Sequence, residues 1–296
     1  MRQLAYLALV ALACVGPPAA DAPEVVDDAV AGAAFQEQGS VLAGYDFQER
    51  DWYVDLPGRL EEVSGLAFSP DGRLFAHDDE RGRIHEIDPS SGALGKRFDL
   101  GEDLVLGDFE GLAIVGERFF AVVSTGLLYE FREGGDGENV EYQLTDTGLG
   151  AGCEIEGFDV DPIDQALLFA CKVATPGRGT IVVQRLPLDP TQTRKSPLEV
   201  ARTQLEAWNV SREFAPSGIA VSPSGTFLIL SGRNDAIIEV DRAGQVVGAV
   251  LLSKGRHPQS EGIAFGPDGS LYVSDEKNGK AARLTAYIRR SEESSR

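Results

Sequence analysis

Ser260-Glu261-Gly262-Ile263-Ala264-Phe265 is one of five similar stretches that decide the fold of this 296-residue chain. Each copy places Ser or Glu before a Gly and continues as a short apolar strand, and the five glycines follow at spacings of 46, 46, 61 and 44 residues. A repeat of this length indicates an array of similar structural units. The other four copies are Val63-Ser64-Gly65-Leu66-Ala67-Phe68, Phe109-Glu110-Gly111-Leu112-Ala113-Ile114, Ile155-Glu156-Gly157-Phe158-Asp159-Val160 and Pro216-Ser217-Gly218-Ile219-Ala220-Val221.

Each unit continues with a turn and further short strands. In three units a Pro-containing turn such as Ser69-Pro70-Asp71-Gly72 follows the first strand, and a second apolar strand comes next. A third, alternating strand is legible in the first, second and fourth units, for example over Ala236–Val240. No run between Asp51 and Arg289 has helical periodicity over three turns. Units of about 45 residues with four short antiparallel strands predict an all-β protein, a β-propeller.

The spacing of the glycines predicts five blades. The last unit ends after its third strand, whereas an unassigned strand, Trp52–Leu56, precedes the first unit. We expect this N-terminal strand to complete the last blade and close the ring. The longest spacing then reflects an insertion over Leu188–Phe214, and six blades are the alternative if this insertion contains a degenerate blade.

The composition excludes several classes of protein. The chain has 47 Asp and Glu against 27 Lys and Arg, which gives a formal net charge of -20. Because this charge repels phosphate backbones, we expect no nucleic acid partner. Contents of 43% hydrophobic and 25% charged residues exclude disorder for most of the chain. We expect a folded monomer.

The N-terminus has the features of an export signal. Arg2 precedes an apolar stretch, Leu4–Ala13, that is too short to span a membrane, as in a secretory signal peptide over residues 1–13. Ala11-Leu12-Ala13-Cys14 resembles a bacterial lipobox, in which the cysteine is lipidated, although Leu at position 11 would match better. The same residues fit ordinary signal peptidase. We favour an envelope or periplasmic protein held to the membrane only by a lipid at Cys14, and a secreted soluble protein is the alternative.

The rest of the chain divides into three parts. Residues 14–48 are rich in Ala, Gly, Pro, Asp and Glu and predict a flexible tether. Residues 49–290 form the expected propeller, and residues 291–296 form a polar tail. Cys153 and Cys171 flank an expected hairpin that turns near Pro162–Gln165, so they fall within disulfide range. An oxidising compartment permits this bridge, and two buried free thiols are the alternative.

The residue before each repeated glycine is the main functional candidate. The first strand of each propeller blade lines the axial channel, so five copies form a ring at one mouth. This ring consists of Ser64, Glu110, Glu156, Ser217 and Glu261. We expect the ends of the second strands to add to the same face Asp78, Asp79, Glu80, Ser124, Lys172, Asn234, Asp275 and Glu276.

An acidic mouth of this kind needs protons, a cation or a basic partner, since its carboxylates repel one another. Oxygen ligands without Cys or His favour a hard cation, and Ca²⁺ tolerates an irregular site better than Mg²⁺. We therefore expect Ca²⁺ at Glu110, Glu156 and Glu261. We expect the ligand-binding residues to be Ser64, Ser217, Asp78, Asp275, Glu276 and Lys172. The alternative is that the Glu-Gly pair only builds the blade, with Lys172 or an Arg neutralising the remaining charge.

Motifs for covalent catalysis are missing from the sequence. It has no Gly-x-Ser-x-Gly elbow, no His-x-x-x-His zinc pair and no phosphate-binding Gly loop in a suitable context. His77 and His257 are placed where they could reach the acidic face, whereas His85 lies in an expected third strand.

The ordered Ser-Gly and Glu-Gly motifs resemble those of the SdiA-regulated domain family of bacterial envelope propellers. The resemblance covers about Trp52–Ile288, and its most specific part runs from His257 to Glu276. More distantly, the sequence is similar to esterase-like phytase and gluconolactonase-type propellers, whose axial Glu-Gly and Asn-Gly positions bind a divalent metal. This likeness implies metal ligands at Glu110, Glu156 and Glu261. Ser217 stands where the lactonase group has Asn, which argues against transferring its hydrolytic activity.

Three functions follow from these observations. We expect a cell-envelope propeller whose calcium-binding mouth binds an unknown small molecule or an envelope protein. The alternative is a calcium-dependent hydrolase of phosphate or carboxylic esters, with His77, His257 or Asp275 as the general base. A purely structural envelope protein is the third possibility, and it requires neither metal nor pocket.

Overall fold

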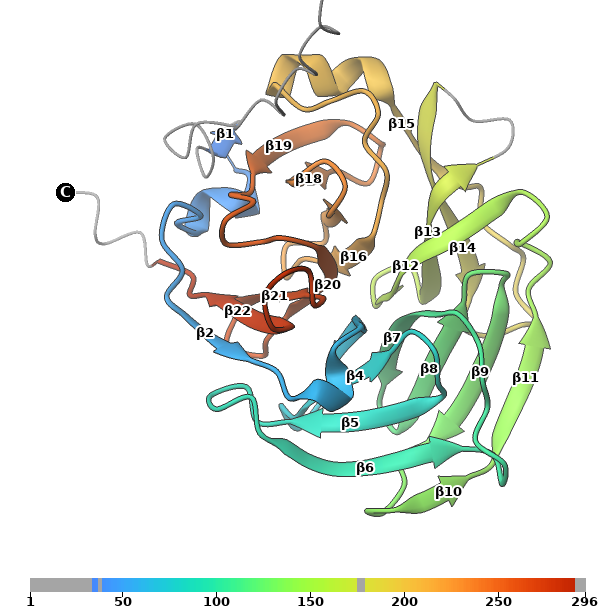
Figure 1. The fold of residues 1–296 in the computed structure, drawn as a ribbon. Helices are drawn as coiled ribbons and strands as arrows, with labels where there is room; N and C mark the ends of the chain where they lie inside the picture. The colour runs from blue at the N-terminus through green and yellow to red at the C-terminus, as the bar shows by residue number, and fades with distance from the viewer. Residues whose placement is uncertain (1–33, 37–38, 175–178, 291–296) are drawn as a thin grey trace, which may run out of the picture.

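The computed structural model describes residues 34–36, 39–174 and 179–290. These residues form five β-sheets around a common axis, and the first strand of each blade lies nearest the axis (Figure 1). Each blade contains four antiparallel strands, and two of the five sheets carry a fifth strand. The prediction of an all-β, five-bladed propeller is therefore confirmed, and the six-bladed alternative is wrong.

A short strand from the sequence of the second blade joins the sheet of the first blade. Blade 1 comprises β3 (Val63–Phe68), β4 (Leu74–Asp78), β5 (Arg83–Ile87) and β6 (Leu94–Leu100). Blade 2 comprises β7 (Phe109–Val115), β8 (Arg118–Val123), β9 (Leu127–Arg132) and β11 (Tyr142–Asp146). Between β9 and β11 the chain forms β10 (Glu138–Val140), which pairs in parallel with β6. Blade 1 thereby gains a fifth strand from the segment that belongs to blade 2 in the sequence.

The remaining blades follow in chain order, and the N-terminal strand closes the ring as predicted. Blade 3 comprises β12 (Cys153–Asp161), β13 (Ala166–Ala174), β14 (Thr180–Pro187) and β15 (Leu198–Ala201). Blade 4 comprises β16 (Gly218–Val221), β17 (Phe227–Ser231), β18 (Ala236–Val240) and β19 (Val246–Leu251). Blade 5 comprises β20 (Ser260–Phe265), β21 (Leu271–Asp275), β22 (Arg283–Tyr287) and the N-terminal β2 (Trp52–Asp55).

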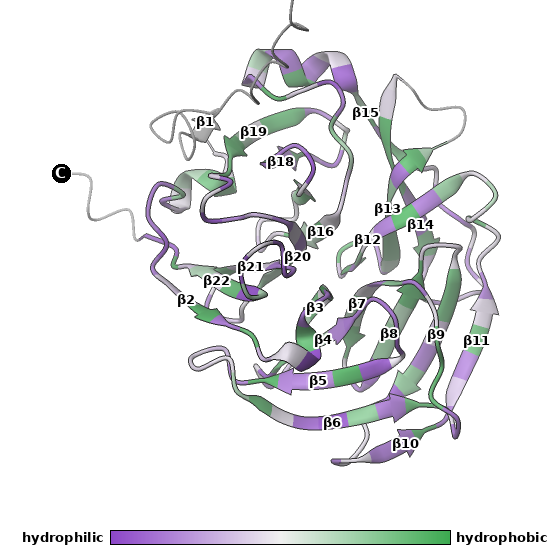
Figure 2. Ribbon diagram, in the orientation of Figure 1, coloured by the Kyte–Doolittle hydropathy of each residue, from purple (hydrophilic) through white to green (hydrophobic). Residues whose placement is uncertain are grey.

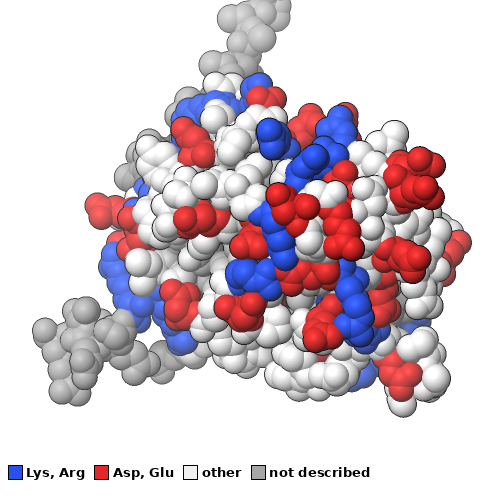
Figure 3. Space-filling view, turned by 90° about the horizontal axis from the view of Figure 1, so that it is seen from below, with Lys and Arg blue, Asp and Glu red and all other residues white. Residues whose placement is uncertain are grey.

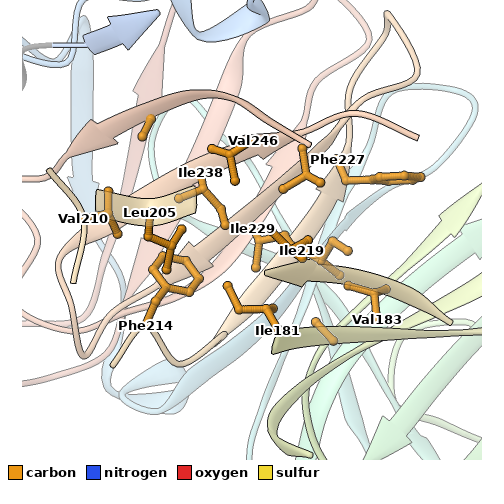
Figure 4. Close-up of a cluster of buried hydrophobic side chains, with 14 of the residues drawn as sticks. Ile181, Val183, Leu205, Val210, Phe214, Ile219, Phe227, Ile229, Ile238 and Val246 are labelled. Carbon is orange, nitrogen blue, oxygen red and sulfur yellow. The ribbon is translucent and has the colours of Figure 1, made fainter. Parts of the chain in front are cut away.

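The insertion expected over Leu188–Phe214 contains part of blade 3 and no further blade. It supplies β15 and a 3-10 helix, η3 (Arg202–Trp208). Leu205 and Phe214 of this segment are fully buried between blades 3 and 4. Figure 4 shows this cluster, which also holds Ile181 of β14 and Ile238 of β18. The insertion therefore fills the space between two blades.

Similar clusters lie between each pair of neighbouring blades. The strands that supply them, such as β8 and β9, are largely apolar (Figure 2). On the side of the molecule shown in Figure 3, acidic and basic side chains are interspersed. Glu133 is an example of such mixed charge in the molecule, since it pairs with both Arg73 and Lys96. In the part of the chain that the structure describes, no helix has the length and apolarity needed to cross a membrane.

The folded part begins before residue 49, the boundary expected from the sequence. β1 (Ala34–Gln36) pairs with β19, and a 3-10 helix, η1 (Val41–Gly44), follows it. Leu42 and Phe47 are buried between blades 4 and 5. Because these apolar side chains have a place in the core, residues 40–47 are not a tether. The expected signal peptide, Cys14 and the polar tail over 291–296 lie outside the described residues.

The repeated glycines bring the five inner strands together. A Cβ atom placed on Gly111 would lie 2.3 Å from Phe158 Cβ, and one on Gly218 would lie 2.6 Å from the Glu261 carbonyl oxygen. A Cβ atom on Gly262 would lie 2.9 Å from the Ser64 carbonyl oxygen, which belongs to the first blade. Each contact joins one blade to the next. Glycine at this position therefore allows the ring to close at its observed size.

We expect Gly218→Ala to lower the free energy of unfolding by about 1 to 3 kcal/mol, because the added methyl group collides with backbone that cannot move aside. Gly179→Ala is the matched control, since a Cβ atom there meets nothing within 4 Å. Urea unfolding of the two variants measures the difference. Equal stabilities would contradict the role assigned to the glycine contact.

Candidate functional site

The structure brings the predicted ring residues to one end of the axis. Ser64, Glu110, Glu156 and Glu261 lie near the starts of β3, β7, β12 and β20, and Ser217 directly precedes β16. Each inner strand packs against the next, and β20 packs against β3 to complete the circle. The three ring glutamates are therefore close enough to influence one another electrostatically.

Each ring glutamate occupies an extra position in its strand. In β7, Phe109 pairs with Val123 and Gly111 pairs with Val122, so Glu110 has no partner on β8. Glu156 in β12 and Glu261 in β20 are skipped in the same way. A β-bulge of this kind releases a side chain from the regular alternation of the strand and re-aims it. The bulges explain how the glutamate side chains of three regularly paired inner strands can point toward the same end of the axis.

Glu110 holds a proton at neutral pH. Burial raises the pKa of its carboxyl to about 10, and repulsion from Glu156, Asp108 and Glu261 adds to the shift. The Ser64 hydroxyl lies 3.5 Å from Glu110 Oε2, at the limit of a hydrogen bond. Glu110 thus enters the mouth as a neutral carboxyl group that can donate or accept a hydrogen bond.

Glu156 is paired with the ammonium group of the mouth. Lys172 Nζ, from β13, donates a hydrogen bond of 2.8 Å to Glu156 Oε1. Burial raises the pKa of Glu156, and this bond opposes the rise. Burial alone would lower the pKa of Lys172, but its bond to Glu156 raises the pKa overall. A disulfide between Cys153 and Cys171 joins the same two strands and fixes the pair of residues relative to one another.

Glu261 and Glu276 form the blade 5 side of the mouth. Burial raises the pKa of Glu261 to about 8, with repulsion from Glu276 as the next cause. Burial and repulsion from Asp79 raise the pKa of Glu276 to about 7. Gln259 donates a hydrogen bond from Nε2 to Glu276. Both carboxyls therefore change protonation near neutral pH, where small changes in the mouth alter their charge.

Two of the expected ligand residues form contacts within the fold. The Ser217 hydroxyl donates to the Ser260 carbonyl oxygen at 2.8 Å and accepts from the Gly232 N–H at 3.0 Å. Asp275 is fully buried, and its carboxylate accepts a hydrogen bond from the Ser260 hydroxyl at 3.0 Å. His257 Nδ1 lies 2.9 Å from the other oxygen of Asp275. These contacts join blades 4 and 5 and place Asp275 away from solvent.

The blade 1 side is also largely enclosed. His77 is fully buried, its Nδ1 lies 2.8 Å from the Asp78 carbonyl oxygen, and burial lowers the pKa of the imidazole to about 4. Asp78 is buried as well, and burial raises its pKa. Asp79 is half-buried, and burial raises its pKa to about 6. Of these three residues Asp79 is the most exposed, and its charge adds to the effect of burial on the pKa of Glu276.

The sequence reasoning missed three acidic neighbours of the ring. Glu62 acts on Glu276, Asp108 acts on Glu110, and Glu154 acts on Glu156. Each lies two positions before a ring residue in the sequence. This common offset is the signal that could have identified them.

The mouth has the oxygen chemistry for a hard cation but lacks a preformed metal site. Among the residues that the structure describes, no group of three or more His, Cys, Asp or Glu side chains comes together in a way that could hold a metal ion. Lys172 already bonds Glu156, and Glu110 carries a proton at neutral pH. Calcium binding at Glu110, Glu156 and Glu261 stays a prediction that requires these groups to rearrange.

The raised pKa of Glu110 predicts a pH-dependent stability. The folded protein binds this proton more tightly than the unfolded chain, so stability is lost as pH rises from about 4.5 to about 10. Glu110→Gln should remove this loss, which amounts to at most about 1.4 kcal/mol per pH unit. Urea unfolding near pH 6 and near pH 9 measures it, with exposed Glu102→Gln as the control. Parallel pH dependence in wild type and Glu110→Gln would refute the assignment.

Comparison with solved structures shows that the fold is shared with propeller proteins of diverse sequence. Glutaminyl cyclase from Myxococcus xanthus matches with a TM-score of 0.57 at 16% identity, covering 81% of this chain and 94% of that one. The PQQ-bound aldose sugar dehydrogenase from Streptomyces coelicolor matches with a TM-score of 0.53 at 12% identity, covering 81% and 97%. Identities this low show similarity of fold alone.

Comparison of sequences gives a more specific result. A search of curated proteins found no match. The sequence model of the SdiA-regulated family matches residues 47–279. This range includes all five repeated glycines and the three ring glutamates. Since this match covers most of the chain, and the five-bladed fold agrees with the resemblance seen in the repeats, the protein belongs to the SdiA-regulated family.

Proposed function

We propose that this protein is a ligand-binding module of the bacterial cell envelope whose axial mouth binds a cation. The supporting observation is the set of three bulged ring glutamates, which share one ammonium group, that of Lys172, within hydrogen-bond distance of Glu156. Protons on Glu110 and Glu261 relieve the remaining repulsion at neutral pH. A cation that enters the mouth replaces these protons, so binding is coupled to their release.

Calcium is the first cation to consider. Carboxylate oxygens from three blades suit a hard ion, and Ca²⁺ accepts irregular oxygen geometry. Binding would turn Glu110 and Glu261 toward a shared ion and shift Lys172 away from Glu156. The bound ion would then present its free positions to an anionic or hydroxyl-bearing ligand, or to an envelope protein.

The three general bases expected for the hydrolase alternative are enclosed in the fold. His257 and Asp275 contact one another inside blade 5, with exposures of 1% and 0%. His77 is fully buried and is neutral at neutral pH. A general base must reach the proton that it removes. Because the three expected bases are enclosed, we propose a binding role rather than catalysis.

The decisive experiment is calcium titration of the EDTA-treated mature protein. A site that is specific to the folded state stabilises it by about 2.7 kcal/mol at a hundredfold excess of Ca²⁺ over Kd. The double variant Glu156→Gln, Glu261→Gln should lose this stabilisation. The control Glu102→Gln, Glu141→Gln removes two exposed carboxylates and should retain it. Calorimetry in two buffers of different ionisation enthalpy detects the expected proton release.

Two results would overturn the proposed cation site. One is an unfolding temperature that does not respond to Ca²⁺, Mg²⁺ or Mn²⁺. The other is an equal response in wild type and the Glu156→Gln, Glu261→Gln variant, which would place the ion elsewhere.

The location is tested separately. We propose that a lipid on Cys14, a residue outside the described part of the chain, holds the mature protein to the membrane. Fractionation of cells that produce the full chain should find wild type in the membrane fraction and Cys14→Ser in the soluble fraction. Ala11→Leu improves the lipobox and should remain with the membrane. Membrane association of Cys14→Ser would argue against the anchor.

A further inference from the structure

The end of the axis opposite the acidic mouth carries a different pocket. A cavity of about 320 Å³ is lined by the last residues of all five inner strands and by the turn after β16. Most of the residues that line it are apolar, and they include the partly exposed Phe68 and Phe265. None of the ring glutamates contributes to it. The volume lies at the lower end of the range of small-molecule sites, which is about 300 to 1,000 Å³.

One residue of this pocket departs from the repeat. The position two residues after the repeated glycine holds Ala in four blades, at Ala67, Ala113, Ala220 and Ala264. In blade 3 the same position holds Asp159, which lines the pocket together with Ala67 and Ala264. An alanine at this position is therefore compatible with the blade, and the carboxyl group is an addition to the common pattern.

Among the residues that the structure describes, the Asp159 carboxyl group has no cationic partner. Its Oδ1 accepts a hydrogen bond of 2.7 Å from the Val160 N–H, and its Oδ2 accepts one of 2.7 Å from the Val221 N–H. Within the described residues no Lys, Arg or His forms an ion pair with it, since the nearby Arg242 pairs with Asp161. Burial raises the pKa of Asp159 to about 6. At slightly alkaline pH the pocket thus holds a carboxylate that accepts two backbone hydrogen bonds but whose charge no described cation neutralises.

We propose that this pocket binds a small organic monoamine. The apolar wall favours a compact hydrocarbon or aromatic group. The carboxylate has lone pairs beyond the two backbone hydrogen bonds, and these can accept from an ammonium group. The aromatic rings of Phe68 and Phe265, which line the pocket, can add a second attraction for a cation. A neutral apolar ligand would gain only the contact with the apolar residues of the wall.

Benzylamine and benzyl alcohol test the proposal because they have nearly the same size and differ in charge. Near pH 8 both Asp159 and the amine are ionised, the amine behaving like a lysine side chain. Calorimetry or ligand-observed NMR should give wild type at least about tenfold tighter binding of benzylamine than of benzyl alcohol, as expected for one charge-assisted hydrogen bond.

Asp159→Ala restores the residue of the other four blades and should remove the preference for the amine. Asp159→Asn keeps the shape and should do the same, so a folding defect in one variant leaves the other as a test. The control Asp103→Asn removes an exposed carboxylate outside the pocket and should bind both ligands like wild type. Circular dichroism confirms that each variant is folded.

Three outcomes would overturn the proposal. Equal affinity of wild type for the two ligands would show that charge is not recognised. Unchanged binding of benzylamine by folded Asp159→Ala would show that this carboxylate is not used. Loss of benzylamine binding in Glu156→Gln, Glu261→Gln, with retention in Asp159→Ala, would place the amine in the acidic mouth.

Discussion

The close approach of five inner strands at their glycines is the constraint on which the rest of the structure depends. A Cβ atom at Gly111 or Gly218 would lie only 2.3 or 2.6 Å from an atom of the next blade. The ring can close at this radius because glycine has no side chain. The same contact brings the preceding residues of neighbouring blades near one another. Repulsion among Glu110, Glu156 and Glu261 is therefore a direct consequence of how the ring is closed.

Several features of the mouth reduce the repulsion among its carboxylates. The bulges give each ring glutamate freedom of direction, Lys172 neutralises Glu156, and a proton neutralises Glu110. Ser217 has a different role, since its hydroxyl bonds backbone groups of two blades. Ser217 thus helps to hold two blades together at the position where three other blades supply a carboxyl group.

The sequence allowed prediction of the blades because each one repeats the same local pattern, and the unpaired strand at Trp52 identified the closure. It could not reveal the bulges, which depend on one unpaired residue in each strand. It also missed the packing of Leu42 and Phe47, since these residues have no periodic pattern and meet their partners only in the folded core. The enclosure of Asp275 and His257 depends on contacts between strands β20, β21 and β22 that spacing alone does not specify.

All five inner strands run in the same direction along the axis, so a single repeat determines the chemistry of both ends. The residue before each glycine collects at one mouth, and the residues two and three positions after it collect at the other. A polar first position and an apolar last position make the two ends unlike in charge. Asp159 breaks this separation in one blade, and it does so where burial raises the pKa of its carboxyl to about 6. The other four blades hold alanine at this position, and the two backbone hydrogen bonds of Asp159 leave its charge without a counter-ion among the described residues, so a bound cation would supply what the fold does not.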